Sequence, residues 1–169
     1  VDFKFAAWSD SQGHNHGAWA AEPLEPTISM MKHMVQSGVA FGLTTGDLAE
    51  DGASYSDTRD YYLDRVARHL GTSVPWFAAW GNHDSSSPTA PLRLASDMPS
   101  RYREGLSAGH GSFSFVYSNC FFVCLDQFYR QEITNGWLEE QLASPESRQA
   151  RFRFLGVHVP PYCERWIDG

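Results

Sequence analysis

The sequence has no apolar run long enough to cross a bilayer and no excess of positive charge. Its longest apolar stretches, such as Phe121–Leu125, are far shorter than the ~20 residues that a transmembrane helix needs. Thirteen Lys and Arg against twenty Asp and Glu give a net charge of −7. A chain of this charge is poorly suited to a nucleic-acid backbone or an anionic membrane, so we expect neither partner.

Cysteine is also scarce. There are three cysteines, and Cys120 and Cys124 are too close in sequence to be bridged if they share a strand, because their Cα atoms would lie about 13 Å apart. Their spacing is not the C-x-x-C of a zinc or redox site. We interpret them as buried thiols, which leaves the compartment open, with a periplasmic or extracellular location slightly favoured.

The 169 residues, 42% of them hydrophobic and 20% charged, have the length and composition of one globular domain covering 1–169. Apolar runs alternate with amphipathic segments, which predicts an α/β fold, and a hairpin replaces the alternation in the second half. The predicted strands are 3–9, 39–45, 74–80, 112–117, 120–126 and 152–157, and the predicted helices are 27–37, 55–70 and 134–142, the last with Thr134 as N-cap. We expect the second helix to have one apolar face formed by Tyr62, Val66 and Leu70, and the third to direct Trp137, Leu138 and Leu142 inward.

Polar residues follow four of these strands at the point where each ends. They are Asp10, Asp47, Asn82 and His158. In α/β sheets, ligands bind outside the carboxyl ends of the strands, so these side chains can meet in one crevice. Any one of them alone could be a turn residue, but four carboxylate, amide and imidazole groups at strand exits indicate a metal site.

The segments around these residues resemble motifs of a known family. They are Ser9–Gln12, Gly46-Asp47, the tetrapeptide Gly81-Asn82-His83-Asp84, and Val157–Tyr162. In order and spacing they are similar to the motifs of calcineurin-like metallophosphoesterases, and the H-x-P-x-Y ending is similar to the purple-acid-phosphatase-like branch. The resemblance implies a two-sheet α/β sandwich with a dinuclear metal centre at one end.

The same resemblance implies a role for each motif residue. Asp10 and Gln12 would hold the first metal ion, Asp47 would bridge both ions, and Asn82 and His158 would hold the second. His83 would protonate the leaving oxygen, with Asp84 orienting it. The implied reaction is hydrolysis of phosphomonoesters or phosphodiesters by a metal-bridging hydroxide, with two divalent or trivalent ions such as Mn, Fe or Zn.

Three departures from the family pattern qualify this prediction. Gln12 stands where many members have His, and a neutral oxygen ligand suits Mn²⁺ or Mg²⁺ better than Zn²⁺. Glu50 stands where purple enzymes have Tyr, so we expect no iron–tyrosinate colour. The family's late G-H-x-H segment, which supplies a histidine to each metal, does not follow His158. We therefore expect a C-terminally incomplete fold that a missing segment or a second chain completes.

Three further residues are candidates for contact with substrate. A literal G-H-x-H is found early, at Gly13–His16, and Tyr162 follows the last motif. His14 and His16 could replace the missing metal histidines, contact a substrate phosphate, or be solvated loop residues. Tyr162 could line a substrate pocket or simply pack.

Two classes of function fit these observations. The first is an enzyme acting on a small phosphoester, which the intact Asn82-His83-Asp84 group favours. The second is a catalytically weakened scaffold or binding module, which Gln12 and the absent late segment favour. A nuclease for long nucleic acids is disfavoured because the sequence has no basic stripe.

Overall fold

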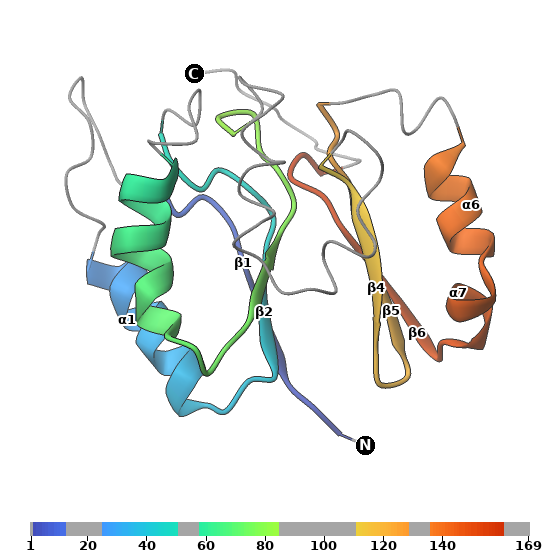
Figure 1. Cartoon of the computed structure of the whole chain (residues 1–169), viewed down its shortest axis with the longest axis horizontal. Coiled ribbons are helices and arrows are strands. Elements are labelled where there is room, and N and C mark those ends of the chain that lie inside the picture. The colour runs from blue at the N-terminus through green and yellow to red at the C-terminus, as the bar shows by residue number, and fades with distance from the viewer. Residues whose placement is uncertain (1, 13–24, 51–57, 85–110, 129–135, 161–169) are drawn as a thin grey trace.

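The computed structural model describes residues 2–12, 25–50, 58–84, 111–128 and 136–160. Two three-stranded sheets face each other, and helices cover their outer faces (Figure 1). This is the predicted two-sheet α/β sandwich. Within the described ranges, none of the helices combines the length and apolarity that a bilayer crossing needs.

The first sheet is parallel and carries the first three motifs. It contains β1 (Phe5–Trp8), β2 (Phe41–Thr44) and β3 (Trp76–Ala78) in that order. The register aligns Trp8 with Thr44 and Thr44 with Ala78. All three strands therefore end at the same edge, and the loops that follow them begin side by side.

Helix α1 (Glu25–Gln36) joins β1 to β2 across the outer face of this sheet. Its apolar positions recur at helical spacing, and Met31 and Met34 are buried. The connection from β2 to β3 is a wide π-type helix, η1 (Thr58–Val66), followed by a 3₁₀ turn, η2 (Ala67–Leu70). The expected apolar face is confirmed, because Tyr62, Val66 and Leu70 are fully buried.

The second sheet combines the predicted hairpin with one parallel strand. Strands β4 (Phe113–Tyr117) and β5 (Cys120–Cys124) are antiparallel, and β6 (Phe152–Gly156) pairs with β5 in parallel. Cys120 and Cys124 are buried free thiols, as expected, and burial raises the pKa of Cys124 further above its usual range. Among the described strands, the order β4-β5-β6 leaves β6 at an edge.

The segment between β5 and β6 differs from the prediction. Helix α6 spans Trp137–Ala143 and its N-cap is Gly136, not Thr134, which lies outside the described residues. Leu142, expected to face inward, is 41% exposed. A second short helix, α7 (Pro145–Gln149), was not predicted, although Ser144 caps it and proline begins it. The spacing of the apolar residues alone did not show which face of α6 packs on the sheet.

Phenylalanine rings fill the space between the two sheets. The ring of Phe41 in β2 lies 5.2 Å from that of Phe122 in β5, and Phe77 in β3 stacks on Phe115 in β4 at 4.3 Å. Such aromatic pairs stabilise the packing beyond the area that they bury. The rigid core fixes the carboxyl ends of β1, β2 and β3 relative to the end of β6.

Candidate metal centre

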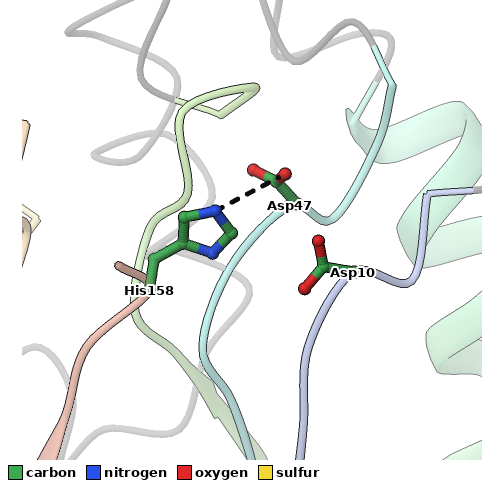
Figure 2. Close-up of side chains that lie close together, drawn as sticks. All are labelled: Asp10, Asp47 and His158. Carbon is green, nitrogen blue, oxygen red and sulfur yellow. Dashed lines mark ion pairs between the residues drawn. The ribbon is translucent and has the colours of Figure 1, made fainter. Parts of the chain in front are cut away.

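Three of the four strand-exit residues converge at one point. Asp10 follows β1, Asp47 follows β2 and His158 follows β6, and one ligand atom from each lies within 4.8 Å of the other two. Figure 2 shows the three side chains directed toward one another. Residues 37 to 148 positions apart in the sequence meet here because the two sheets end at the same side of the sandwich.

The backbone at two of these residues is strained. Asp10 and Asp47 both have φ of 53°, the left-handed region that non-glycine residues seldom occupy. Two hydrogen bonds tie the loops together there: Asp10 N donates to the Gly46 carbonyl at 3.1 Å, and Gln12 N donates to the Asp47 carbonyl at 3.2 Å. Strain of this kind is typical of functional sites, where the surrounding structure holds it in place.

Asp47 is the centre of the cluster and is only 3% exposed. Its Oδ1 accepts the backbone N–H of His83 at 3.1 Å, and its Oδ2 accepts Gln12 Nε2 at 3.1 Å. His158 Nε2 is 3.6 Å from the same Oδ2. A carboxylate oxygen has a second lone pair, so both Asp47 oxygens can still bind a cation.

The orientation of the His158 ring leaves Nε2 available as a metal ligand. Nδ1 lies 3.1 Å from the Thr45 carbonyl oxygen, which can only accept, so Nδ1 is assigned the proton. Nε2 of the neutral ring then carries a lone pair, and it is directed at Asn82 Oδ1, 3.0 Å away. Two lone-pair atoms facing each other at this distance suit a shared cation.

Gln12 supplies an independent indication of a cation. Its Oε1 is buried and accepts no hydrogen bond among the described residues. A buried amide oxygen without a donor is costly unless something positive lies beside it. The donor set of carboxylate, amide and imidazole groups therefore fits a metal ion.

The His83 ring lies beside Asp47, but its shortest contact is with a backbone carbonyl oxygen. Its Nδ1 is 2.6 Å from the Glu50 carbonyl oxygen, and its Nε2 is 3.9 Å from Asp47 Oδ2. Burial opposes the charged ring, but the hydrogen bond to Glu50 and the nearby negative charges, Asp47 first, outweigh it and raise the pKa of His83. The raised pKa favours a ring that carries a proton.

Asp84 holds backbone amides of the loops around the site. Its carboxylate accepts backbone N–H groups from Asp47 at 2.7 Å, Leu48 at 2.9 Å and Gly81 at 2.9 Å. Nδ1 of the His83 ring faces the carbonyl oxygen of Glu50, and the orienting role of Asp84 stays a prediction. Burial raises the pKa of Asp84 to about 6, although its hydrogen bonds with the Gly81 and Leu48 amides act in the opposite direction.

The sequence did not predict two backbone contacts of the site. The carbonyl groups of Thr45 and Glu50 were missed, because every residue has a backbone carbonyl and no residue type marks the ones that form a contact. The candidates His14, His16 and Tyr162 lie outside the described residues, and their roles stay predictions.

Comparisons with known proteins agree with this geometry. A family model described as calcineurin-like phosphoesterase matches residues 3–169. No curated protein sequence matches. Among solved structures, the purple acid phosphatase PPD1 from yellow lupin (Lupinus luteus) seeds is similar with a TM-score of 0.56 at 14% identity over 89% of this chain. This chain spans 29% of that one. The fold, the motif order and the family match together place this chain in the calcineurin-like phosphoesterase family.

Proposed function

We propose that this protein is a phosphoesterase that holds two metal ions and hydrolyses small phosphomonoesters or phosphodiesters. The observation that carries the proposal is the convergence of Asp10, Asp47 and His158 from three strand exits, with ligand atoms within 4.8 Å of one another. Membership of the metal-dependent phosphoesterase family supports the reaction class.

The residues sort into two ligand groups around Asp47. Asp10 and Gln12 would hold one ion through a carboxylate and the unpartnered Oε1, and Asn82 and His158 would hold the other through the facing Oδ1 and Nε2. Asp47, whose Oδ2 lies beside both Gln12 Nε2 and His158 Nε2, would contact both ions. Two bound ions such as Mn, Fe or Zn would supply acidification of a water molecule and neutralisation of the phosphoryl oxygens.

His83 would deliver a proton to the leaving oxygen of the substrate. Its Nδ1 donates to the Glu50 carbonyl, so Nε2 is the atom that would hold and transfer the proton. The ring is about one third exposed, so a substrate can reach it. A general acid of this kind raises the rate by about 10²–10⁴-fold.

A binding scaffold is the second candidate, and one contact favours it. Gln12 Nε2 donates to Asp47 Oδ2, which uses a lone pair of the carboxylate that would bridge the ions. A site weakened in this way would bind metal or a phosphate group without turnover.

The test is metal analysis combined with hydrolysis of p-nitrophenyl phosphate and its bis ester. We expect about two bound ions per chain and turnover of at least one substrate, and Asp47→Asn should lose both. Asp60→Asn is the matched control, because Asp60 is an exposed carboxylate on η1. Metal binding without turnover would favour the scaffold, and absence of metal binding would overturn the proposal.

We also propose that a further segment, from this chain or from a second one, completes the sheet beside β6 and brings the remaining metal histidines. The edge strand supports this idea. Phe152, Phe154 and Leu155 are 49%, 36% and 47% exposed and lie on both faces of β6, a pattern typical of a strand whose two faces are both covered. A groove of about 600 Å³, lined in part by Phe3, Phe5, Phe152 and Phe154, opens between this edge and β1.

A further inference from the structure

Asp84 is a buried carboxylate that links two loops of the metal centre. It is 3% exposed, and its hydrogen bonds with the amides of Asp47 and Leu48 reach a loop 36 to 37 residues earlier in the sequence. Its bond with Gly81 N closes its own loop. One side chain therefore joins the segment after β2 to the segment after β3.

The two loops are packed backbone against backbone at this point. A Cβ on Gly46, whose φ is +115°, would lie 2.3 Å from Gly81 N. A Cβ on Gly81 would lie 2.0 Å from Asp47 Oδ1 and 2.5 Å from Asp47 N. There is no room for a side chain where the two loops touch. The position of Asp47 therefore depends on how tightly the loops are held together.

We propose that Asp84 is a positioning residue: its carboxylate clamps the loop after β2 to the loop after β3 and so fixes the Asp47 carboxylate for metal binding. The effect on metal rests on the proposed function, whereas the clamp itself does not. Asp47 has a left-handed φ of 53°, and the bond from its own N–H to Asp84 holds that conformation.

Only a carboxylate performs this task at this position. Two oxygens with about four lone-pair sites accept three amide donors at once, and an ionised acceptor makes the stronger, shorter hydrogen bonds seen here. An amide of the same shape has one oxygen, which can accept from Asp47 and Gly81 or from Leu48, and its NH₂ group then faces the remaining backbone N–H. Asp84→Asn therefore breaks the link between the loops on one side, with almost no change in volume.

The first test measures the clamp directly, by amide hydrogen exchange in the metal-free protein. In Asp84→Asn we expect the amide of Leu48 or that of Gly81, whichever faces the new NH₂ group, to exchange at least about tenfold faster. The Ala79 amide, which donates to the Thr44 carbonyl at 2.8 Å inside the sheet, should keep its protection. Unchanged exchange at Leu48 and Gly81 would overturn the proposal.

The second test measures Mn²⁺ affinity. Loss of a group that orients a metal ligand typically costs about 10–100-fold in affinity, and we expect this loss in Asp84→Asn together with a weaker spin-coupled Mn²⁺ signal in electron paramagnetic resonance. Ser147→Ala is the control, because it loses a buried hydrogen bond from Arg153 in the other sheet and should bind Mn²⁺ like the wild type.

Each outcome of these measurements has a distinct meaning. Fast amide exchange with an unchanged Mn²⁺ affinity would overturn the positioning role. A wild type that binds no Mn²⁺ would overturn the proposed function, and the exchange data would still test the clamp. If Asp84→Asn does not fold, the variant Gly81→Ala is measured in its place. The new Cβ of residue 81 would displace Asp47, while the Asp84 side chain is unchanged. Wild-type affinity in that variant would contradict the proposal.

Discussion

At the scale of single residues, the candidate metal centre is built from strained and unpartnered groups. Asp10 and Asp47 share a left-handed φ of 53°, and Gln12 Oε1 is a buried acceptor that has no donor within the described part of the chain. Each feature costs free energy in the folded chain. Their coincidence at one point is explained by a cation that all three side chains would bind.

His83→Ala separates catalysis from metal binding at this scale. We expect turnover to fall by roughly 10²–10⁴-fold, because a general acid is lost. Metal content should be unchanged, since the contact with Asp47 Oδ1 comes from the backbone N–H of residue 83 and survives the substitution. Steady-state kinetics and metal analysis check both parts.

The control for this variant is His33→Ala, an exposed histidine on α1. It should leave turnover and metal content as they are. If His83→Ala loses its metal together with its activity, the role assigned to the His83 ring is wrong.

At the scale of elements, parallel strands and an aromatic core position the loops. Strands β1, β2 and β3 run in the same direction and end at one edge, which brings Asp10 and Asp47 together. Phe122 of β5 stacks on Phe115 at 4.9 Å and reaches Phe5 and Phe41 of the first sheet at 5.3 and 5.2 Å. One ring thus joins both sheets.

Phe122→Ala tests this joining role. Truncating a fully buried phenylalanine leaves a cavity, and we expect the free energy of unfolding to fall by about 3–5 kcal/mol. Urea denaturation followed by tryptophan fluorescence measures the change. Phe152→Ala, at a ring 49% exposed on β6, should cost about 1 kcal/mol or less. Equal losses in the two variants would show that Phe122 does not join the sheets.

At the scale of the whole molecule, the second sheet has an exposed outer strand. Strand β5 is buried along its entire length, whereas β6 beside it exposes Phe152, Phe154 and Leu155. An edge strand with apolar side chains and unpaired backbone groups promotes association with other chains unless a neighbour covers it. The exposed edge and the groove beside it are where a completing segment would bind.

The chain purified alone should therefore self-associate, and Leu155→Lys should reduce that association, because a charge on an edge strand opposes strand pairing. Sedimentation velocity across a range of concentrations measures both species. A wild-type chain that stays monomeric, holds two metal ions and hydrolyses a phosphoester would contradict the completion proposal.

Much of the architecture could be predicted from sequence because it depends on local pattern. Buried strands are apolar runs in the sequence, so all six strands were located, with ends that differ by zero to two residues. The polar residue after each run marked the strand exits, and Asp10, Asp47 and His158 followed from that rule alone. The amphipathic spacing of Tyr62, Val66 and Leu70 predicted a buried face that is present.

Only the tertiary structure decided which groups meet across the fold. The Asp84 carboxylate binds amides 36 and 37 residues away, the His83 ring binds the carbonyl of Glu50, and the His158 ring binds that of Thr45. Side-chain periodicity reports burial within one element, whereas these contacts depend on which strand ends are neighbours and how their backbones turn. Backbone donors and acceptors are the same at every residue, so the sequence carries no mark of them.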